Sequence, residues 1–97
     1  MNFDGLHPAF EHRARLAAAV LLAGVDEMSF AALKQQLQLT DGNLGAQLRR
    51  LEDEGFIALR RDFIERKPVT WYALTADGRK GLKRHLAALR ALIDGRM

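Results

Sequence analysis

The chain has 97 residues, which is enough for one domain with a hydrophobic core and too few for two. Hydrophobic residues make up 48% and charged residues 28% of it, a balance that excludes a disordered chain. The absence of cysteine excludes disulfides and thiolate metal sites, and the net charge of +3 permits a polyanionic partner without requiring one.

The sequence predicts neither a signal peptide nor a membrane span. Its longest apolar stretch, residues 16–25, is too short to cross a bilayer. The first apolar run follows acidic residues and has no cleavage pattern after it. We therefore expect a cytoplasmic protein without a membrane partner.

Residues 1–6 are expected to form a loose N-terminal arm. Pro8 suits the first turn of a helix, so the pattern predicts a helix over residues 8–24 that ends at Gly24. The second half of this helix is apolar on every side and must be covered. Because so short a chain has few elements for that task, we expect a second subunit to cover it.

Residues 29–55 predict two helices joined by a tight turn, the helix-turn-helix unit. Ser29 can cap the first of these helices, and Thr40 or Asp41 can cap the second. The second helix buries one stripe of leucines spaced four and three apart and ends at Gly55. Those leucines are Leu44, Leu48 and Leu51.

The face opposite these leucines is small at one end and cationic further on. A rigid helix with one face anchored in the core and a small, basic opposite face suits the major groove of DNA. We therefore interpret residues 40–54 as a recognition helix. Its expected DNA-binding residues are Thr40, Asp41, Gly42, Asn43, Gly45, Ala46, Gln47, Arg49 and Arg50.

Residues 56–74 contain two runs rich in β-branched and aromatic residues, which predict a β-hairpin wing. A charged connector, IERK, separates the runs and makes the tip of the hairpin basic. Because arginine can hold a phosphate with two parallel hydrogen bonds, we expect contacts to DNA phosphates from the wing. The expected wing residues are Arg60, Arg61, Arg66 and Lys67.

Thr75 can cap a last helix over residues 75–94, which has leucines and an isoleucine on one stripe. We expect this helix and the first one to form the interface of a homodimer. The interface residues would be Phe10, Leu16, Val20, Leu82, Leu86, Leu89 and Ile93. Residues 1–97 thus predict a single, mainly α domain with a β-hairpin wing, a winged helix-turn-helix with an added C-terminal dimerisation helix.

Several side chains allow a second interpretation. Arg49 and Arg50 lie close to Asp53 and Glu54, so they are either phosphate contacts or ordinary surface ion pairs. Asn43 and Gln47 are the side chains on this helix that can pair with adenine. We favour Asn43, because Gln47 lies at the edge of the leucine stripe.

No pattern in the sequence points to an enzyme, a metal site or a cofactor. The histidines, His7, His12 and His85, do not have the spacing of a helical metal pair. The acidic pair Asp53 and Glu54 continues a helix beside arginines. There is no glycine-rich phosphate loop and no serine nucleophile motif.

Three pieces of the sequence resemble the small winged-helix transcriptional regulators related to the MarR and ArsR groups. LTDGNL opens the recognition helix, LEDEGFI closes it, and WYALTADGR joins the wing to the last helix. The resemblance covers about residues 8–93 and implies a homodimer that binds a pseudo-palindromic operator. It implies that Thr40 and Asn43 occupy positions at which members of the family contact the backbone and the bases of DNA. Many relatives carry a longer polar pair at the positions of Gly45 and Ala46.

The leading hypothesis is therefore a dimeric, sequence-specific DNA-binding regulator, with repression the expected mode. Its two recognition helices would stand about 34 Å apart, one turn of DNA. The alternative is a winged-helix module that binds a protein partner, which the small residues Gly45 and Ala46 favour. A small-molecule effector, if one exists, is expected between the first and last helices at the dimer seam.

Overall fold

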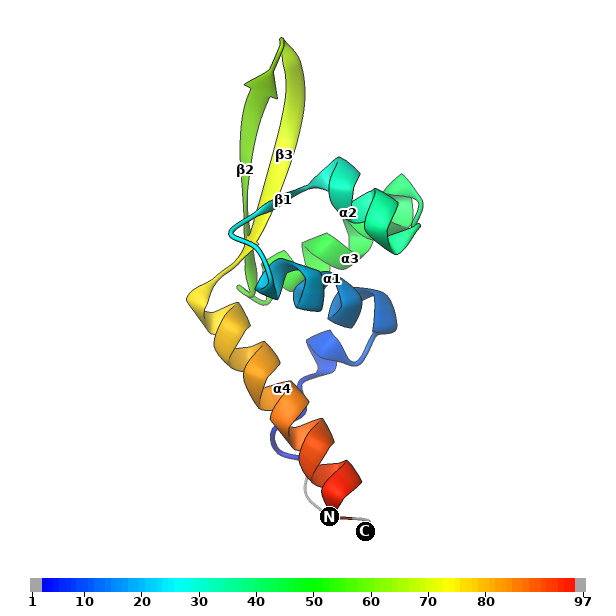
Figure 1. Ribbon diagram of the computed structural model, residues 1–97, viewed down its shortest axis with the longest axis vertical. Coiled ribbons are helices and arrows are strands. Elements are labelled where there is room, and N and C mark those ends of the chain that lie inside the picture. The colour runs from blue at the N-terminus through cyan, green and yellow to red at the C-terminus, as the bar shows by residue number, and fades with distance from the viewer. Residues whose placement is uncertain (1–2, 96–97) are drawn as a thin grey trace.

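The computed structural model describes residues 3–95 and has an elongated shape, 54 × 25 × 21 Å (Figure 1). A hairpin projects from one end and a long helix from the other, with three helices between them. The elements are a 3-10 turn Pro8–Phe10 (η1), α1 Arg13–Ala23, β1 Met28–Ser29, α2 Phe30–Leu37, α3 Asp41–Asp53, β2 Ile57–Ile64, β3 Lys67–Leu74 and α4 Ala76–Asp94. This order and arrangement confirm the predicted winged helix-turn-helix fold.

The first helix begins later than the sequence suggested. Instead of one helix from residue 8, the chain forms η1 and then starts α1 at Arg13. Nδ1 of His7 accepts a hydrogen bond from the amide of Ala9 at 3.0 Å, and Nδ1 of His12 accepts from the amide of Ala14 at 3.2 Å. His7 is thus the N-cap of η1 and His12 is the N-cap of α1, so the chain forms two separate helical segments in place of one.

The apolar half of α1 is covered mainly by its own chain, which corrects the expectation that a second subunit covers it. Ala18, Ala19 and Leu22 are fully buried, because α2, α3 and the sheet each place an apolar side against α1. The buried partners from the other helices include Leu33 and the leucine stripe of α3. Burying such side chains stabilises the fold by about 1.5–3 kcal/mol each. Val20, on the uncovered side of α1, remains exposed.

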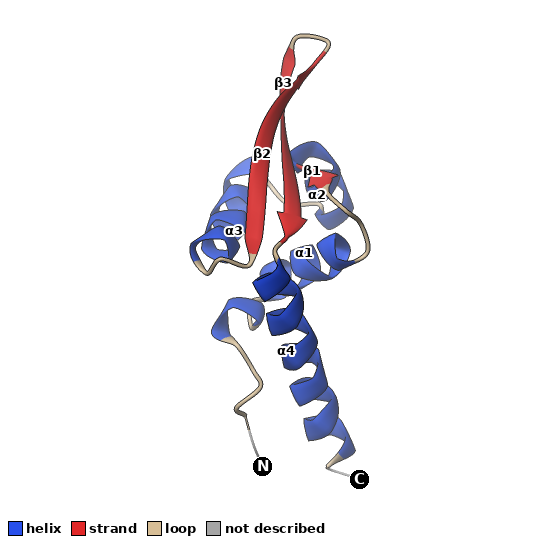
Figure 2. Cartoon of the chain, turned by 90° about the vertical axis from the view of Figure 1, so that its left-hand side faces the viewer, coloured by secondary structure: helices blue, strands red, loops and turns tan. Residues whose placement is uncertain are grey.

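The sheet is antiparallel, in the order β1-β3-β2, and its two long strands form the wing (Figure 2). Their register runs from the pair Ile57–Leu74 to the pair Ile64–Lys67. Ile57 is buried and so lies on the core-side face of the wing. Because successive side chains of a strand point to opposite faces, every second register pair from Ile57 towards the tip also lies on this core-side face. The opposite, outer face carries the remaining pairs. A two-residue turn of Glu65 and Arg66 joins the strands, with both residues in the left-handed region at φ 50° and 67°.

The N-terminal segment over residues 3–7 runs beside α4, so its described part is not the loose arm that we expected (Figure 1). A Cβ at Gly5 would lie 2.7 Å from Cβ of Ala88, which shows how closely the two segments approach. Arg84 of α4 also donates to the carbonyl of Asp4 at 3.2 Å. No helix within residues 3–95 is long and apolar enough to cross a membrane.

Candidate nucleic-acid interface

Helix α3 presents the face that the sequence predicted. The hydroxyl of Thr40 accepts from the amide of Asn43 at 3.1 Å and so caps the helix. The three leucines of the stripe are buried, which fixes the rotation of α3 about its axis. The opposite side is exposed to solvent. Its exposed residues are Gly42, Asn43, Ala46, Arg49 and Arg50.

Two glycines leave open space beside α3. A Cβ built at Gly42 or at Gly45 would have no atom within 4 Å. Glycine in a helix interior costs about 1 kcal/mol relative to alanine. Packing within the described chain gives no reason for that cost, so this side of α3 is open for the close approach of another molecule.

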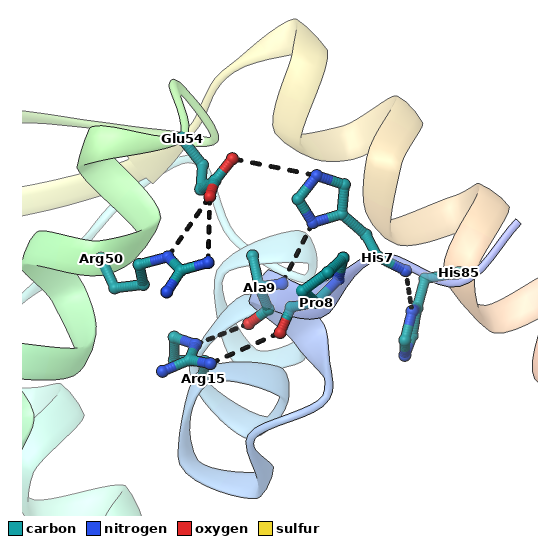
Figure 3. Close-up of polar contacts among 7 residues, drawn as sticks. All are labelled: His7, Pro8, Ala9, Arg15, Arg50, Glu54 and His85. Carbon is teal, nitrogen blue, oxygen red and sulfur yellow. Dashed lines mark hydrogen bonds and ion pairs between the residues drawn. The ribbon is translucent and has the colours of Figure 1, made fainter.

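Asn43 is held in place by a chain of side-chain hydrogen bonds. Gln47 donates from Nε2 to Oδ1 of Asn43 at 3.0 Å and accepts at Oε1 from Nη1 of Arg15 at 2.9 Å. Arg15 in turn donates to the carbonyl oxygens of Ala9 at 2.7 Å and Pro8 at 3.4 Å (Figure 3). Gln47 is thus a support for Asn43, whose amide oxygen keeps a second lone pair for a base. Arg15 was missed from the sequence, because it lies 32 positions before Gln47.

The charged residues of α3 differ in their availability. Arg50 pairs with Glu54 at 3.2 Å, one turn along the helix, and Asp41 pairs with Lys34 at 2.8 Å. The Arg50–Glu54 pair is the surface interaction that the sequence left open as an alternative, whereas the Lys34–Asp41 pair was not predicted. Arg49 is exposed and forms no ion pair with any residue that the structure describes.

Arg60, which we expected to contact DNA, is instead bound to its own chain. Its guanidinium donates to both carboxylate oxygens of Glu27, with Nε 2.9 Å from Oε2, and to Asp62 at 3.0 Å. It also lies 5.5 Å from the ring centre of Trp71. The hydrogen bonds to Glu27 raise the pKa of Arg60 above its usual value, and the bond from Arg60 lowers the pKa of Glu27. These contacts argue against a DNA contact for Arg60.

The other cations of the wing are available. Arg61, Arg66 and Lys67 are exposed and form no ion pair within residues 3–95. They lie in the half of the hairpin that projects beyond the helices (Figure 2). Together with Arg49 they form the cationic set that a polyanion can reach.

The expected dimer residues divide into two groups. Phe10 and Leu82 are only 1% and 4% exposed, and the ring of Phe10 stacks on Phe56 with centroids 5.1 Å apart. Both belong to the core of the single chain, so including them in a dimer surface was wrong. Leu16 packs against the same core, and Leu89 is partly buried. Val20, Leu86 and Ile93 are exposed.

A buried histidine joins the N-terminal segment to α4. Nδ1 of His85 accepts from the amide of His7 at 3.0 Å, and Nε2 of His7 lies 3.8 Å from Glu54 (Figure 3). Burial lowers the pKa of His85, since desolvation penalises the charged imidazole; nearby Glu11 opposes this change, and His7 adds to it. Protonation at Nδ1 would also remove the acceptor of the hydrogen bond.

We expect acid to weaken the fold through His85. Its pKa in the folded state lies below the usual value near 6.5, so the unfolded chain binds the proton first as the pH falls. The contribution of neutral His85 is thus fully present above about pH 6.5 and is lost as the pH falls through the lower folded-state pKa. Urea unfolding between about pH 5 and pH 7.5 measures this loss. His85→Asn keeps an acceptor oxygen without a titration, so a decline as steep as in the wild type would assign the effect to another group.

Comparisons with known proteins agree with this geometry. A model of the winged helix DNA-binding domain family matches residues 14–93. An uncharacterized protein of Methanocaldococcus jannaschii is 34% identical over 77 residues, 79% of this chain and 84% of that protein. A transcriptional regulator homologue from Pyrococcus horikoshii OT3 is 31% identical at a TM-score of 0.84, covering 90% of this chain and 86% of that one.

More distant structures share the fold. A PadR family transcriptional regulator from Eggerthella lenta is 26% identical at a TM-score of 0.68, covering 84% of this chain and 80% of that one. MarR is 21% identical at a TM-score of 0.77, a likeness of fold alone. The predicted resemblance is thereby confirmed, and the chain belongs to the winged helix DNA-binding domain family, with the transcriptional-regulator fold of the MarR and PadR type.

Proposed function

We propose that this protein is a homodimeric, sequence-specific DNA-binding repressor that recognises a pseudo-palindromic operator. One observation carries the proposal: a helix anchored by buried leucines leaves Gly42 and Gly45 open to close approach beside the braced amide of Asn43. Membership of a DNA-binding family supports double-stranded DNA as the molecule that approaches.

In this proposal α3 enters the major groove. The small residues Gly42, Gly45 and Ala46 let its backbone come near the base edges, and Asn43 pairs with adenine. Arg49 contacts a phosphate. The first turn of α3, which Thr40 caps, directs its free backbone amides towards the phosphates of the DNA. With few long side chains to read bases, part of the specificity comes from groove shape and bendability.

The wing supplies the second group of contacts. Arg61, Arg66 and Lys67 follow the phosphates or enter the minor groove beside α3. Each neutralised phosphate releases counterions, so the logarithm of the affinity falls linearly with the logarithm of the salt concentration. Arg60 takes no part, because Glu27 and Asp62 already hold its charge.

The dimer in this proposal uses the uncovered sides of α1 and α4. Val20 on α1 and Leu86 and Ile93 on α4 are large apolar side chains that the single chain leaves exposed, Leu86 by 42% and Ile93 by 60%. A mainly apolar hollow between the two helices, lined in part by Ala23 and Leu86, adds to this surface. In the proposed dimer, a second copy covers this surface and the two α3 helices contact one duplex about one helical turn apart.

Substitutions at Asn43 and Arg66 should separate base reading from phosphate binding. The operator is first selected from a random duplex pool, and affinities for it and for random duplex are then measured across a salt series. Asn43→Ala should weaken operator binding about five- to hundredfold and leave random binding nearly unchanged. Arg66→Ala should weaken both alike and lower the magnitude of the salt slope by about one.

Arg60→Gln combined with Glu27→Gln is the matched control, since it removes an arginine of the same wing together with the carboxylate bound to it and so leaves the net charge unchanged. We expect its salt slope to equal that of the wild type. Equal losses on operator and random DNA for Asn43→Ala would reject its role in base reading. If the wild type binds no duplex even at low salt, the protein-partner module becomes the better account of this fold.

A further inference from the structure

The tip of the wing carries an exposed aromatic ring. Phe63 is 70% exposed, although large apolar side chains are usually covered in a small domain. Its register partner across the hairpin is Pro68, so the two side chains lie together on the core-side face. The tip projects beyond the helices, so no helix of the described chain covers this face there (Figure 2). The pair forms a small apolar point at the far end of the molecule.

A chain of polar contacts braces the strand that leads to this point. Oδ1 of Asp62 accepts from the amide of Phe63 at 2.7 Å, and Oδ2 of Asp62 accepts from Arg60 at 3.0 Å. Arg60 is bound in turn to Glu27, just before β1. On the other side of Phe63, the left-handed turn at Glu65 and Arg66 sets the register of the hairpin. The apolar point is therefore presented by a supported strand.

Cations surround the apolar point. Arg61 is two residues from Phe63 and on the same face, while Arg66 lies in the turn three residues after Phe63 and Lys67 follows on the outer face as the partner of Ile64. The turn also carries one acidic residue, Glu65, and Asp62 shares Arg60 with Glu27, so that cluster keeps one negative charge against the three cations Arg61, Arg66 and Lys67. An apolar side chain with neighbouring unpaired cations fits the minor groove of DNA, where such side chains part a base step while cations bind phosphates.

We propose that Phe63, backed by Pro68, is a wedge that enters the minor groove and partly unstacks a base step, so that the wing bends the duplex. This inference rests on the proposed DNA-binding function and adds a structural change in the DNA to it. The favoured target is a pyrimidine–purine step in A·T-rich sequence, because such steps open most easily and a narrow minor groove attracts arginine. Arg61, Arg66 and Lys67 hold the flanking phosphates.

The test uses an A·T-rich duplex of about 30 base pairs, three helical turns, that contains TA steps labelled with 2-aminopurine. Fluorescence of this base rises when it unstacks, and energy transfer between dyes at the duplex ends reports bending. The variants are Phe63→Thr and, as the matched control, Ile64→Thr. Ile64 is the neighbouring residue, 49% exposed, but lies on the outer face. Threonine suits a strand, and circular dichroism checks that both variants fold.

We expect the wild type to raise the fluorescence and shorten the distance between the ends. Phe63→Thr should lose both signals and bind about tenfold more weakly, in line with the loss of one aromatic–base contact. Ile64→Thr should keep both signals and the affinity of the wild type. Binding by the wild type without either signal would overturn the wedge alone. No binding by the wild type at low salt would overturn the DNA-binding function itself, and self-association that Phe63→Thr abolishes would assign the point to contact between copies.

Discussion

Gly78→Ala is expected to lower the free energy of unfolding by about 3 kcal/mol or more, the largest loss of stability expected among these variants. A Cβ at this position would lie 2.0 Å from the carbonyl oxygen of Phe56 and 2.8 Å from its carbonyl carbon. Neither group can move easily, because the same oxygen accepts from the amide of Thr75 at 3.0 Å and the Thr75 hydroxyl donates to the carbonyl of Gly55 at 2.7 Å. Overpacking of this kind costs about 3 kcal/mol or more, a large part of the stability of a small domain.

Urea unfolding followed by circular dichroism measures this effect. Gly45→Ala is the matched control, a glycine-to-alanine change inside a helix with no atom within 4 Å of the new methyl group. It should stabilise the protein by about 0.5–1 kcal/mol, since alanine favours the helix. A Gly78→Ala midpoint equal to that of the wild type would mean that the start of α4 can shift away from Phe56.

Gly45→Leu is expected to separate stability from DNA binding. Leucine is a good helix former and its Cβ would have no atom within 4 Å, so the unfolding midpoint should stay at or above that of the wild type. The added side chain fills the open space beside α3 and holds the helix away from the groove. Losing one or two base contacts at about 1–3 kcal/mol each lowers operator affinity about tenfold to a hundredfold or more.

Titration of the selected operator with each variant measures this loss. Gly45→Ala again serves as the control, because its methyl group occupies little of the open space and should cost less than about fivefold. If Gly45→Leu binds the operator as tightly as the wild type, the DNA does not approach this side of α3. The recognition surface would then have to be placed elsewhere on the helix or on the wing.

The local parts of this fold could be predicted from the sequence because their causes lie within a few residues. Ser29, Thr40 and Thr75 are the N-caps of α2, α3 and α4, as their side-chain oxygens suggested. The leucine spacing predicted the buried side of α3, and the runs of β-branched and aromatic residues within residues 56–74 predicted the hairpin. The helix start at residue 8 was wrong because histidine is not among the usual capping residues, although His12 caps α1 here.

The availability of each charged residue could not be predicted in the same way. Arg60 and Arg61 are neighbours in a basic run, yet Arg60 is bound to Glu27, 33 positions earlier, while Arg61 has no ion-pair partner within the described residues. Gln47 braces Asn43 only because Arg15 of α1 reaches it across the helix-turn-helix. A pattern of residue types shows which side chains carry a charge, but not which distant carboxylate meets it.

The sequence by itself determined the kind of element over most of the chain, the buried side of α3 and the family, since periodicity, capping and motif are local properties of the chain. Only the tertiary structure decided which surfaces remain for partners. It placed Phe10 and Leu82 in the core and left Phe63 exposed at the tip of the wing. The reason is that burial depends on the packing of elements far apart in the chain, and a stripe of apolar residues looks the same before and after another element covers it.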